Sequence, residues 1–210
     1  MARTVLPRPE DLLAAYAAGW FPMDIDGQLG FYESDPRVII PLEGFRVPRS
    51  VRRALRTAGF ETRIDTAFAE VVDACGGPRH GGAWLTSRLG DLYVALHELG
   101  YAHSVEVWRE GRLVGGLFGV ALGGLFTSES MFHRASDAGN AALVSTHRHI
   151  SDRGYSLWDI QMSSRHTERF GATLITGREY RHLLESALGM ERTFVRSMRP
   201  QAPSPRSLRA

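Results

Sequence analysis

The sequence contains a single cysteine and no lysine. Because only Cys75 among the 210 residues carries a thiol, no disulfide can form within the chain and no multi-cysteine zinc site can be built. No apolar run approaches the ~20 residues needed to cross a bilayer. The start of the chain, with Arg3 and Arg8, is not followed by an apolar segment of signal-peptide length. These absences predict a protein of the reducing cytoplasm with no membrane partner.

A strong charge of one sign is also lacking. The chain has 25 basic residues, all of them arginine, and 23 acidic residues, so its net charge is only +2. A net charge this small does not by itself indicate a nucleic-acid partner. A GC-rich genome that replaces lysine codons accounts for the arginine bias. Any functional meaning of the arginines therefore depends on where they lie. The composition, 43% apolar and 23% charged, is typical of an ordinary globular protein with one large domain or two small ones.

Several common catalytic signatures are missing. His97-Glu98 is followed by Tyr101 at the place where a zinc metalloprotease helix needs its second histidine. The serines around Glu129 lack the glycines of a hydrolase elbow, and neither a P-loop lysine nor a dinucleotide-binding glycine motif occurs. The eight histidines show no metal-ligand spacing. No metal site is predicted.

Hydrophobic periodicity predicts helices in the first half of the chain and a strand meander in the second. Helices are expected at residues 9–19, 48–58, 66–75, 87–99, 138–152, near 166 and at 179–188. Strands are expected at 38–40, 103–108, 113–122, 125–127 and 157–162, with turn-rich segments at 21–30 and 33–37. Three meander strands, a helix, a strand and a helix form an α+β order in which the late strand joins the meander sheet.

The same pattern predicts the organisation of the chain. We expect a small N-terminal α+β part at residues 1–82, a second domain at 83–190 and a flexible tail, rich in Arg and Pro, at 191–210. The order of the second domain is that of a GNAT-like acyltransferase. In that fold, the turn before the helix carries a glycine-rich loop for the diphosphate of coenzyme A. Here Asp137 occupies the central glycine position and would repel a diphosphate, so coenzyme A is disfavoured.

Four arginines form a basic face on the predicted helix at 48–58. They are Arg49, Arg52, Arg53 and Arg56. Their spacing of i, i+3, i+4 and i+7 places them on one side of a helix, and no carboxylate lies between Glu43 and Glu61 to pair with them locally. An external polyanion and a solvated face whose partners come from elsewhere in the fold are equally good interpretations.

Three polar residues stand in apolar surroundings. Asp159 and Gln161 alternate with Trp158, Ile160 and Met162 in a late strand, so they share one face. Glu129 lies in an equally apolar stretch near the end of the meander. The polar side chains of such residues either form hydrogen bonds with backbone groups or take part in catalysis. An acid and an amide that orient an incoming amine suit acyl transfer to nitrogen.

Longer motifs resemble those of the leucyl/phenylalanyl-tRNA–protein transferase family. The matching runs are HELGYAHSVEVW at 97–108, LVGGLFGV at 113–120, ESMF at 129–132, WFPM at 20–23, SDPR at 34–37, WLT at 84–86, DIQ at 159–161, HT at 166–167 and FGA at 170–172. The resemblance extends over about residues 10 to 187. It implies an enzyme that moves Leu or Phe from aminoacyl-tRNA to the N-terminal Arg or Lys of a protein and so creates an N-degron for protein degradation.

The resemblance also implies roles for individual residues. Asp159, Gln161 and Glu129 would be catalytic, and Trp84 would pack on the terminal adenosine of the tRNA. The wall of the amino-acid pocket would consist of Leu117, Phe126, Met131 and Leu143. Arg49, Arg52, Arg53 and Arg56 would bind the acceptor stem. An apolar pocket discriminates by only ~1–3 kcal/mol per methylene, so Met is a further candidate donor. No metal or coenzyme is implied, and we expect a monomer.

Two other functions are consistent with the same residues. One is a GNAT-type N-acyltransferase that uses acyl coenzyme A, against which Asp137 argues. The other is a non-catalytic tRNA-binding protein that uses only the basic helix face. RNA affinity that survives the loss of Asp159 would favour the latter.

Overall fold

The computed structural model describes residues 7–25, 27–76 and 84–195. The helices in these ranges are α1 (Pro9–Ala17), α2 (Arg49–Thr57), α3 (Phe68–Gly76), α4 (Ser87–Glu98), α5 (Ala138–Asp152), α6 (Arg165–Glu168) and α7 (Gly177–Leu188). The strands are β1 (Phe21–Ile25), β2 (Gln28–Tyr32), β3 (Arg37–Ile39), β4 (Glu61–Ile64), β5 (Ala102–Arg109), β6 (Arg112–Leu122), β7 (Leu125–His133), β8 (Leu157–Gln161) and β9 (Thr173–Ile175). None of the described helices is long and apolar enough to cross a membrane.

Seven strands form one mixed sheet in the order β4-β5-β6-β7-β8-β3-β9. Every neighbouring pair is antiparallel except β7 and β8, which run parallel. The predicted α+β class and the joining of the late strand to the meander are therefore confirmed. β7 and β8 pair only from Leu125↔Leu157 to Thr127↔Asp159, although both strands continue. The sheet opens beyond these pairs, at the place where Glu129 and Gln161 lie.

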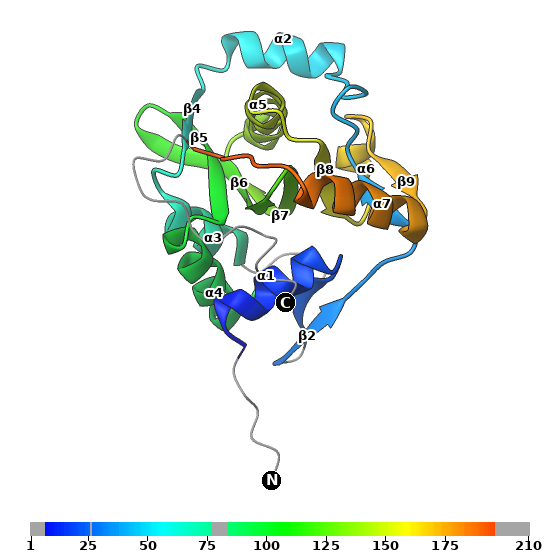
Figure 1. The fold of residues 1–210 in the computed structure, drawn as a ribbon. Coiled ribbons are helices and arrows are strands. Elements are labelled where there is room, and N and C mark those ends of the chain that lie inside the picture. The colour runs from blue at the N-terminus through cyan, green and yellow to red at the C-terminus, as the bar shows by residue number, and fades with distance from the viewer. Residues whose placement is uncertain (1–6, 26, 77–83, 196–210) are drawn as a thin grey trace.

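Helices cover both faces of the sheet (Figure 1). One buried cluster contains apolar residues from α1, α3, α4 and α7. The other lies beneath α5 and includes Val51 of α2, and α2 lies outside α5 (Figure 1). Burial of these apolar stripes is the main stabilising contribution of the fold.

Four short strands, β1, β2, β4 and β9, were not expected from the sequence. The segment predicted to be rich in turns forms the hairpin of β1 and β2, with Phe21 opposite Tyr32. Pro22, Asp24 and two glycines hide its strand character, because these residues are typical of turns. β4 and β9 are short edge strands of four and three residues. Strands this short contain too few residues to show an alternating pattern.

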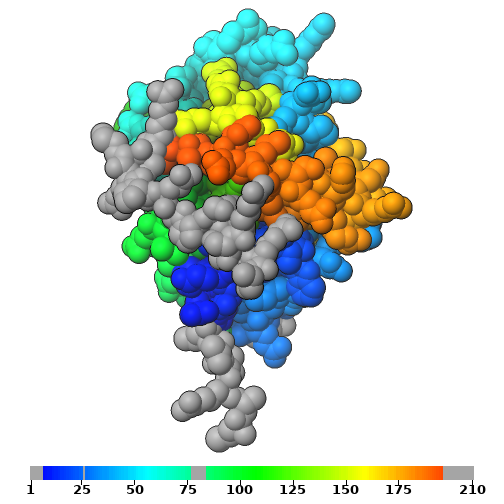
Figure 2. All heavy atoms as spheres, viewed as in Figure 1, coloured from blue at the N-terminus to red at the C-terminus, as the bar shows by residue number. Residues whose placement is uncertain are grey.

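The expected parts of the chain share this sheet. β3 and β4 come from the segment before residue 82, and β5 to β9 come from the segment after it. The expected boundary itself lies outside the described residues, as does the predicted tail from residue 196 onward. The start of that tail is packed, because Phe194 is buried and its carbonyl oxygen lies 2.7 Å from His149 Nε2. In Figure 2 the atoms of this segment lie beside those of α5.

Candidate active site

A pocket of about 210 Å³ lies at the opening between β7 and β8. We call it the β7–β8 pocket. Its walls are formed by Phe21, Pro22, Met23, Trp84, Glu129, Ile160, Gln161 and Met162. Three residues singled out from the sequence, Trp84, Glu129 and Gln161, thus meet in one place, although they lie far apart in the chain.

Glu129 is the one carboxylate among the described residues that line this pocket. The register of β6 and β7 shifts at its position, where Phe118 pairs with Ser130 and Gly119 with Ser128. Glu129 is therefore the extra residue of a β-bulge, a feature that re-aims a side chain. Thr127 Oγ1 donates to its Oε1 at 2.6 Å. Burial raises the pKa of Glu129 above its usual value, and the hydroxyl donors around it offset only part of that rise.

Two buried tyrosines support Glu129 from inside the fold. Tyr93 OH donates to Glu129 Oε2 at 3.0 Å, and Tyr16 OH lies 2.7 Å from Tyr93 OH. Burial, and then the charge of Glu129, raises the pKa of both tyrosines well above the usual value. They therefore remain neutral hydrogen-bond donors that hold the carboxylate in place.

Gln161 is held at both its backbone and its side chain. Its side-chain Nε2 donates to Glu129 Oε1 at 3.1 Å. Its backbone N–H donates to Asp159 Oδ1 at 2.9 Å, and its carbonyl oxygen accepts from Ser34 Oγ at 3.2 Å. Its φ of 55° lies in the left-handed region that side chains other than glycine rarely adopt. These contacts fix that unusual backbone and point the amide toward Glu129.

Asp159 lies behind the pocket and does not line it. Its side chain has no exposed surface, and its carboxylate forms a bidentate ion pair with Arg37, with Nη2 2.6 Å from Oδ2 and Nε 3.0 Å from Oδ1. Tyr180 OH donates to Asp159 Oδ2 at 2.7 Å. The Arg37 guanidinium also donates to the carbonyl of Gly19 and lies 4.4 Å from the centre of the Tyr180 ring. The link between Asp159 and the pocket is thus the hydrogen bond that the backbone N–H of Gln161 donates to its carboxylate.

Arg37, Tyr180, Tyr93 and Tyr16 were missed by sequence reasoning. They come from four elements, β3, α7, α4 and α1, so no local spacing connects them to Asp159 or Glu129. The one available signal was the SDPR run, which ends at Arg37.

The predicted wall of the amino-acid pocket lies on the other face of the sheet. Leu117, Phe126 and Leu143 are buried and Met131 is partly buried in the cluster beneath α5. None of the four lines the β7–β8 pocket. The structure therefore separates these apolar residues from Glu129 by the plane of the sheet.

The four arginines of the predicted basic face are exposed on α2. Val51 of the same helix is buried, so the helix is anchored by its apolar side. Within the described residues, neither an ion pair nor a hydrogen bond is found for the side chains of Arg49, Arg52, Arg53 and Arg56. The face remains available to an anionic partner.

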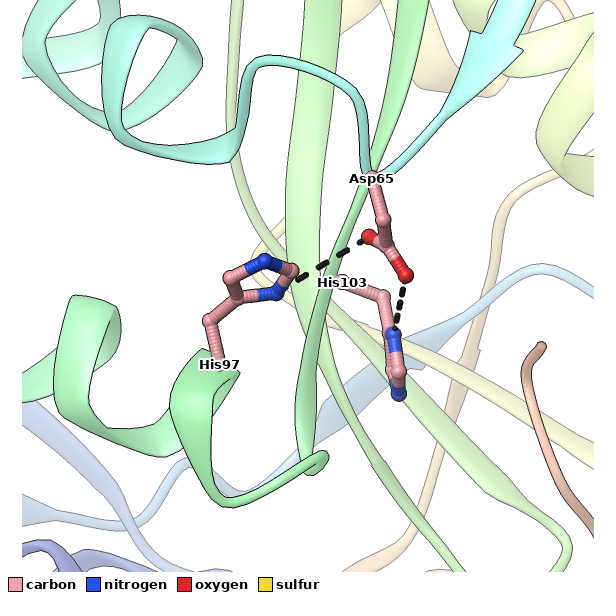
Figure 3. A group of neighbouring side chains, drawn as sticks. All are labelled: Asp65, His97 and His103. Atoms are coloured by element: carbon pink, nitrogen blue, oxygen red, sulfur yellow. Dashed lines mark hydrogen bonds and ion pairs between the residues drawn. The ribbon is translucent and has the colours of Figure 1, made fainter. Parts of the chain in front are cut away.

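The histidines show no metal-ligand spacing in the sequence, but the structure brings two of them together with an aspartate. Side-chain atoms of Asp65, His97 and His103 lie within 4.8 Å of one another, and Figure 3 shows the carboxylate between the two rings. Asp65 Oδ2 is 2.7 Å from His103 Nδ1. However, His97 Nδ1 also lies 2.8 Å from the carbonyl oxygen of Ala102, and His103 Nε2 lies 3.2 Å from that of Gly100. These ring nitrogens are engaged within the chain, and the cluster fastens β4, α4 and β5 to one another.

Comparison with known proteins identifies relatives over most of the chain. A family model described as leucyl/phenylalanyl-tRNA protein transferase matches residues 39–185, and the N-terminal domain model of the same family matches residues 7–35. The leucyl/phenylalanyl-tRNA–protein transferase of Stutzerimonas stutzeri is 47% identical over 171 residues, which cover 80% of this chain and 76% of that protein. That of Herpetosiphon aurantiacus is 45% identical over 187 residues, covering 89% and 97%.

A more distant likeness is found to a solved structure. The C-terminal domain of a putative lysylphosphatidylglycerol synthetase from Agrobacterium fabrum aligns with a TM-score of 0.43 and 13% identity, covering 81% of this chain and 60% of that chain.

Proposed function

Since this chain belongs to the leucyl/phenylalanyl-tRNA–protein transferase family and is an aminoacyltransferase that works with tRNA, we propose that it moves Leu or Phe to proteins that begin with Arg or Lys. The product would be an N-degron, made in the cytoplasm by a monomer. The observation that carries the proposal is the pairing of Glu129 with Gln161 in one pocket beside Trp84. An acid, an amide and an aromatic surface are what aminoacyl transfer to an amine requires.

We further propose how the chain divides this work. Residues 83–190 would form a GNAT-like catalytic domain, because they supply the meander, α5 and β8. Residues 1–82 would add the basic helix α2 and the β1 wall of the pocket. Both segments contribute to the site, because the β7–β8 pocket takes Phe21, Pro22 and Met23 from β1 and the other residues from the second segment.

The donor ester is placed with its adenosine against Trp84. An indole ring at the pocket wall offers a base-stacking surface worth ~1–3 kcal/mol. The aminoacyl side chain would pass through the opening between β7 and β8 toward Leu117, Phe126, Met131 and Leu143 beneath α5. The pairing of the two strands over only three residue pairs supports this path. Arg49, Arg52, Arg53 and Arg56 would meanwhile hold the acceptor stem.

Glu129 is the group we assign to the proton of the acceptor amine. An α-amine has a pKa near ~8 and is largely protonated at neutral pH, so the acceptor enters as an ammonium ion that the carboxylate attracts. Glu129 takes one proton, and the freed amine attacks the ester carbonyl carbon. As the C–N bond forms and the C–O bond to the ribose breaks, the second proton of the nitrogen passes to the departing ribose oxygen. Glu129 then gives its own proton to water, so the reaction releases one proton overall and needs no coenzyme.

Gln161 and Asp159 have positioning roles in this scheme. The Gln161 amide donates to Glu129, and its side-chain oxygen is left to accept from the amine. Asp159 is fully buried and already paired with Arg37, so it holds the Gln161 backbone in place and does not itself meet the substrate. This alignment is the main contribution that an already activated ester needs.

Use of acyl coenzyme A is the weaker alternative. Asp137 sits at the N-terminal end of α5 with a φ of 64°, and its Oδ1 accepts from Asn140 Nδ2 at 2.6 Å. This places a carboxylate where the diphosphate would bind, as the sequence suggested. Acyl transfer from coenzyme A is therefore not expected.

The proposal is tested by transfer of labelled leucine from Leu-tRNA to peptides that begin with Arg, Lys or Ala. We expect label on the Arg and Lys peptides only, and none on an N-acetylated Arg peptide, because the α-amine is the nucleophile. Equal labelling of the Ala peptide would refute the acceptor rule. Absence of label from all peptides would refute the transferase assignment.

A further inference from the structure

Three exposed arginines outside α2 lie in the segment that enters that helix and in the segment that follows β8. They are Arg46, in the segment before α2, and Arg165 and Arg169, at α6. No ion pair within the described residues involves any of them. The mechanism above does not use them.

The path of the chain places Arg165 close to the pocket mouth. Met162 lines the pocket, and Arg165 follows Gln161 by four residues. Since a chain extends by at most ~3.6 Å per residue, these two Cα atoms lie within about 14 Å. The start of α6 therefore lies near the mouth of the pocket.

Arg46 and Arg169 extend the path to α2. The backbone N–H of Arg46 donates to the carbonyl oxygen of Phe170 at 3.0 Å, which places Arg46 beside Arg169. Arg46 precedes Arg49 by only three residues. In Figure 1, α6 lies next to the segment that enters α2, and the same segments adjoin on the surface in Figure 2. The arginines thus form an interrupted line from α2 to the pocket.

Basic residues outnumber acidic residues along this line. Burial lowers the pKa of His166, and the charges of Arg169 and His133 lower it further. Two carboxylates lie along this stretch of the chain, Glu43 before Arg46 and Glu168, whose Oε1 accepts from Ser163 Oγ at 2.8 Å. The Glu168 carboxylate is thus hydrogen-bonded to the segment before α6. The three arginines outnumber the two carboxylates, so this stretch carries a net positive charge.

We propose that Arg46, Arg165 and Arg169, here called the α6 arginines, bind phosphates of the unpaired 3′ end of the tRNA between the acceptor stem on α2 and the aminoacyl ester in the pocket. The inference rests on the proposed function. Guanidinium groups bind phosphate oxygens through paired charge-assisted hydrogen bonds. A single strand that runs between two fixed points needs such contacts along its length, and the α6 arginines lie between those points.

The test uses the double variant Arg165→Ala, Arg169→Ala with two donors, Leu-tRNA and 3′-O-leucyl-adenosine, which has no phosphate. We expect KM for Leu-tRNA to rise roughly tenfold, with KM for leucyl-adenosine unchanged. The dependence of tRNA affinity on salt should weaken by about 0.7 in logarithmic slope for each lost contact to a single strand. The matched control is Arg109→Ala, Arg112→Ala at the β5–β6 turn, which removes the same charge near the far edge of the sheet.

An unchanged KM for Leu-tRNA would overturn the inference. So would an equal rise for leucyl-adenosine, which indicates damage to the pocket, or an equal rise in the control pair, which indicates a general charge effect. Affinity for uncharged tRNA is measured in parallel. A lower affinity of the double variant for uncharged tRNA would support the proposed phosphate contacts even if the wild-type protein showed no transfer. Absence of transfer would refute the proposed function only.

Discussion

Replacement of Glu129 by Gln should reduce the transfer rate by about 10²–10⁴-fold, the usual contribution of a positioned proton acceptor. Gln keeps the shape of the side chain and can still accept from Thr127 and donate within the pocket, but it cannot take the proton of the acceptor ammonium. The rate is measured in a single turnover with Leu-tRNA and an Arg peptide, so that release of product does not hide the step.

The matched control for this variant is Glu98→Gln, at the exposed end of α4. It changes the same chemical group outside the pocket and should leave the rate unchanged. A Glu129→Gln enzyme that retains at least a third of the wild-type rate would show that the amine loses its proton elsewhere, and the role assigned to Glu129 would be wrong.

Replacement of Arg37 by Met should lower the free energy of unfolding by about 3–5 kcal/mol. This is the usual effect of removing one partner of a buried ion pair, because the other charge is left without compensation. Asp159 would retain the Tyr180 hydroxyl and the Gln161 N–H as donors, but no cation. The loss is measured by urea unfolding, with the slope checked so that the two-state treatment holds.

The double variant Arg37→Met, Asp159→Asn separates charge from shape. It removes the uncompensated carboxylate while keeping an oxygen that can accept from Tyr180. We therefore expect it to be more stable than Arg37→Met alone. If Arg37→Met loses less than about 1 kcal/mol, the pair does not hold the site together, and another explanation for the fixed backbone of Gln161 is needed.

The sequence predicted the long elements of the fold well. The helix at 138–152 and the strand at 113–122 carry strong periodic patterns, and α5 and β6 match them closely. The late strand was placed in the meander sheet correctly, because an apolar strand of this kind must be buried. The hairpin of β1 and β2 was missed because its proline and glycines resemble a loop.

The candidate site was predicted in part. Glu129 and Gln161 stood out because a polar side chain in an apolar strand needs a reason, and the structure brings both to one pocket. Asp159 stood out for the same reason, but its partner Arg37 lies 122 residues away in the chain. Pairings over such distances leave no periodic signal. For the same reason, the cluster of Asp65, His97 and His103 could not be read from spacing.

The measurement that tests the account most directly is the pH dependence of kcat/KM for an Arg peptide. The reactive pair is ionised Glu129 and the protonated amine. The rate should therefore rise with pH through a pKa above that of an ordinary glutamate, because burial raises the pKa of Glu129. It should fall again as the peptide amine loses its proton near pH ~8. In Glu129→Gln the limb at the pKa of Glu129 should disappear, and the residual rate should rise through the pKa of the peptide amine, because only an amine that is already neutral can react. A wild-type rate that keeps rising through the pKa of the amine would mean that the acceptor binds as a neutral amine, and it would contradict the assignment of Glu129 as the proton acceptor.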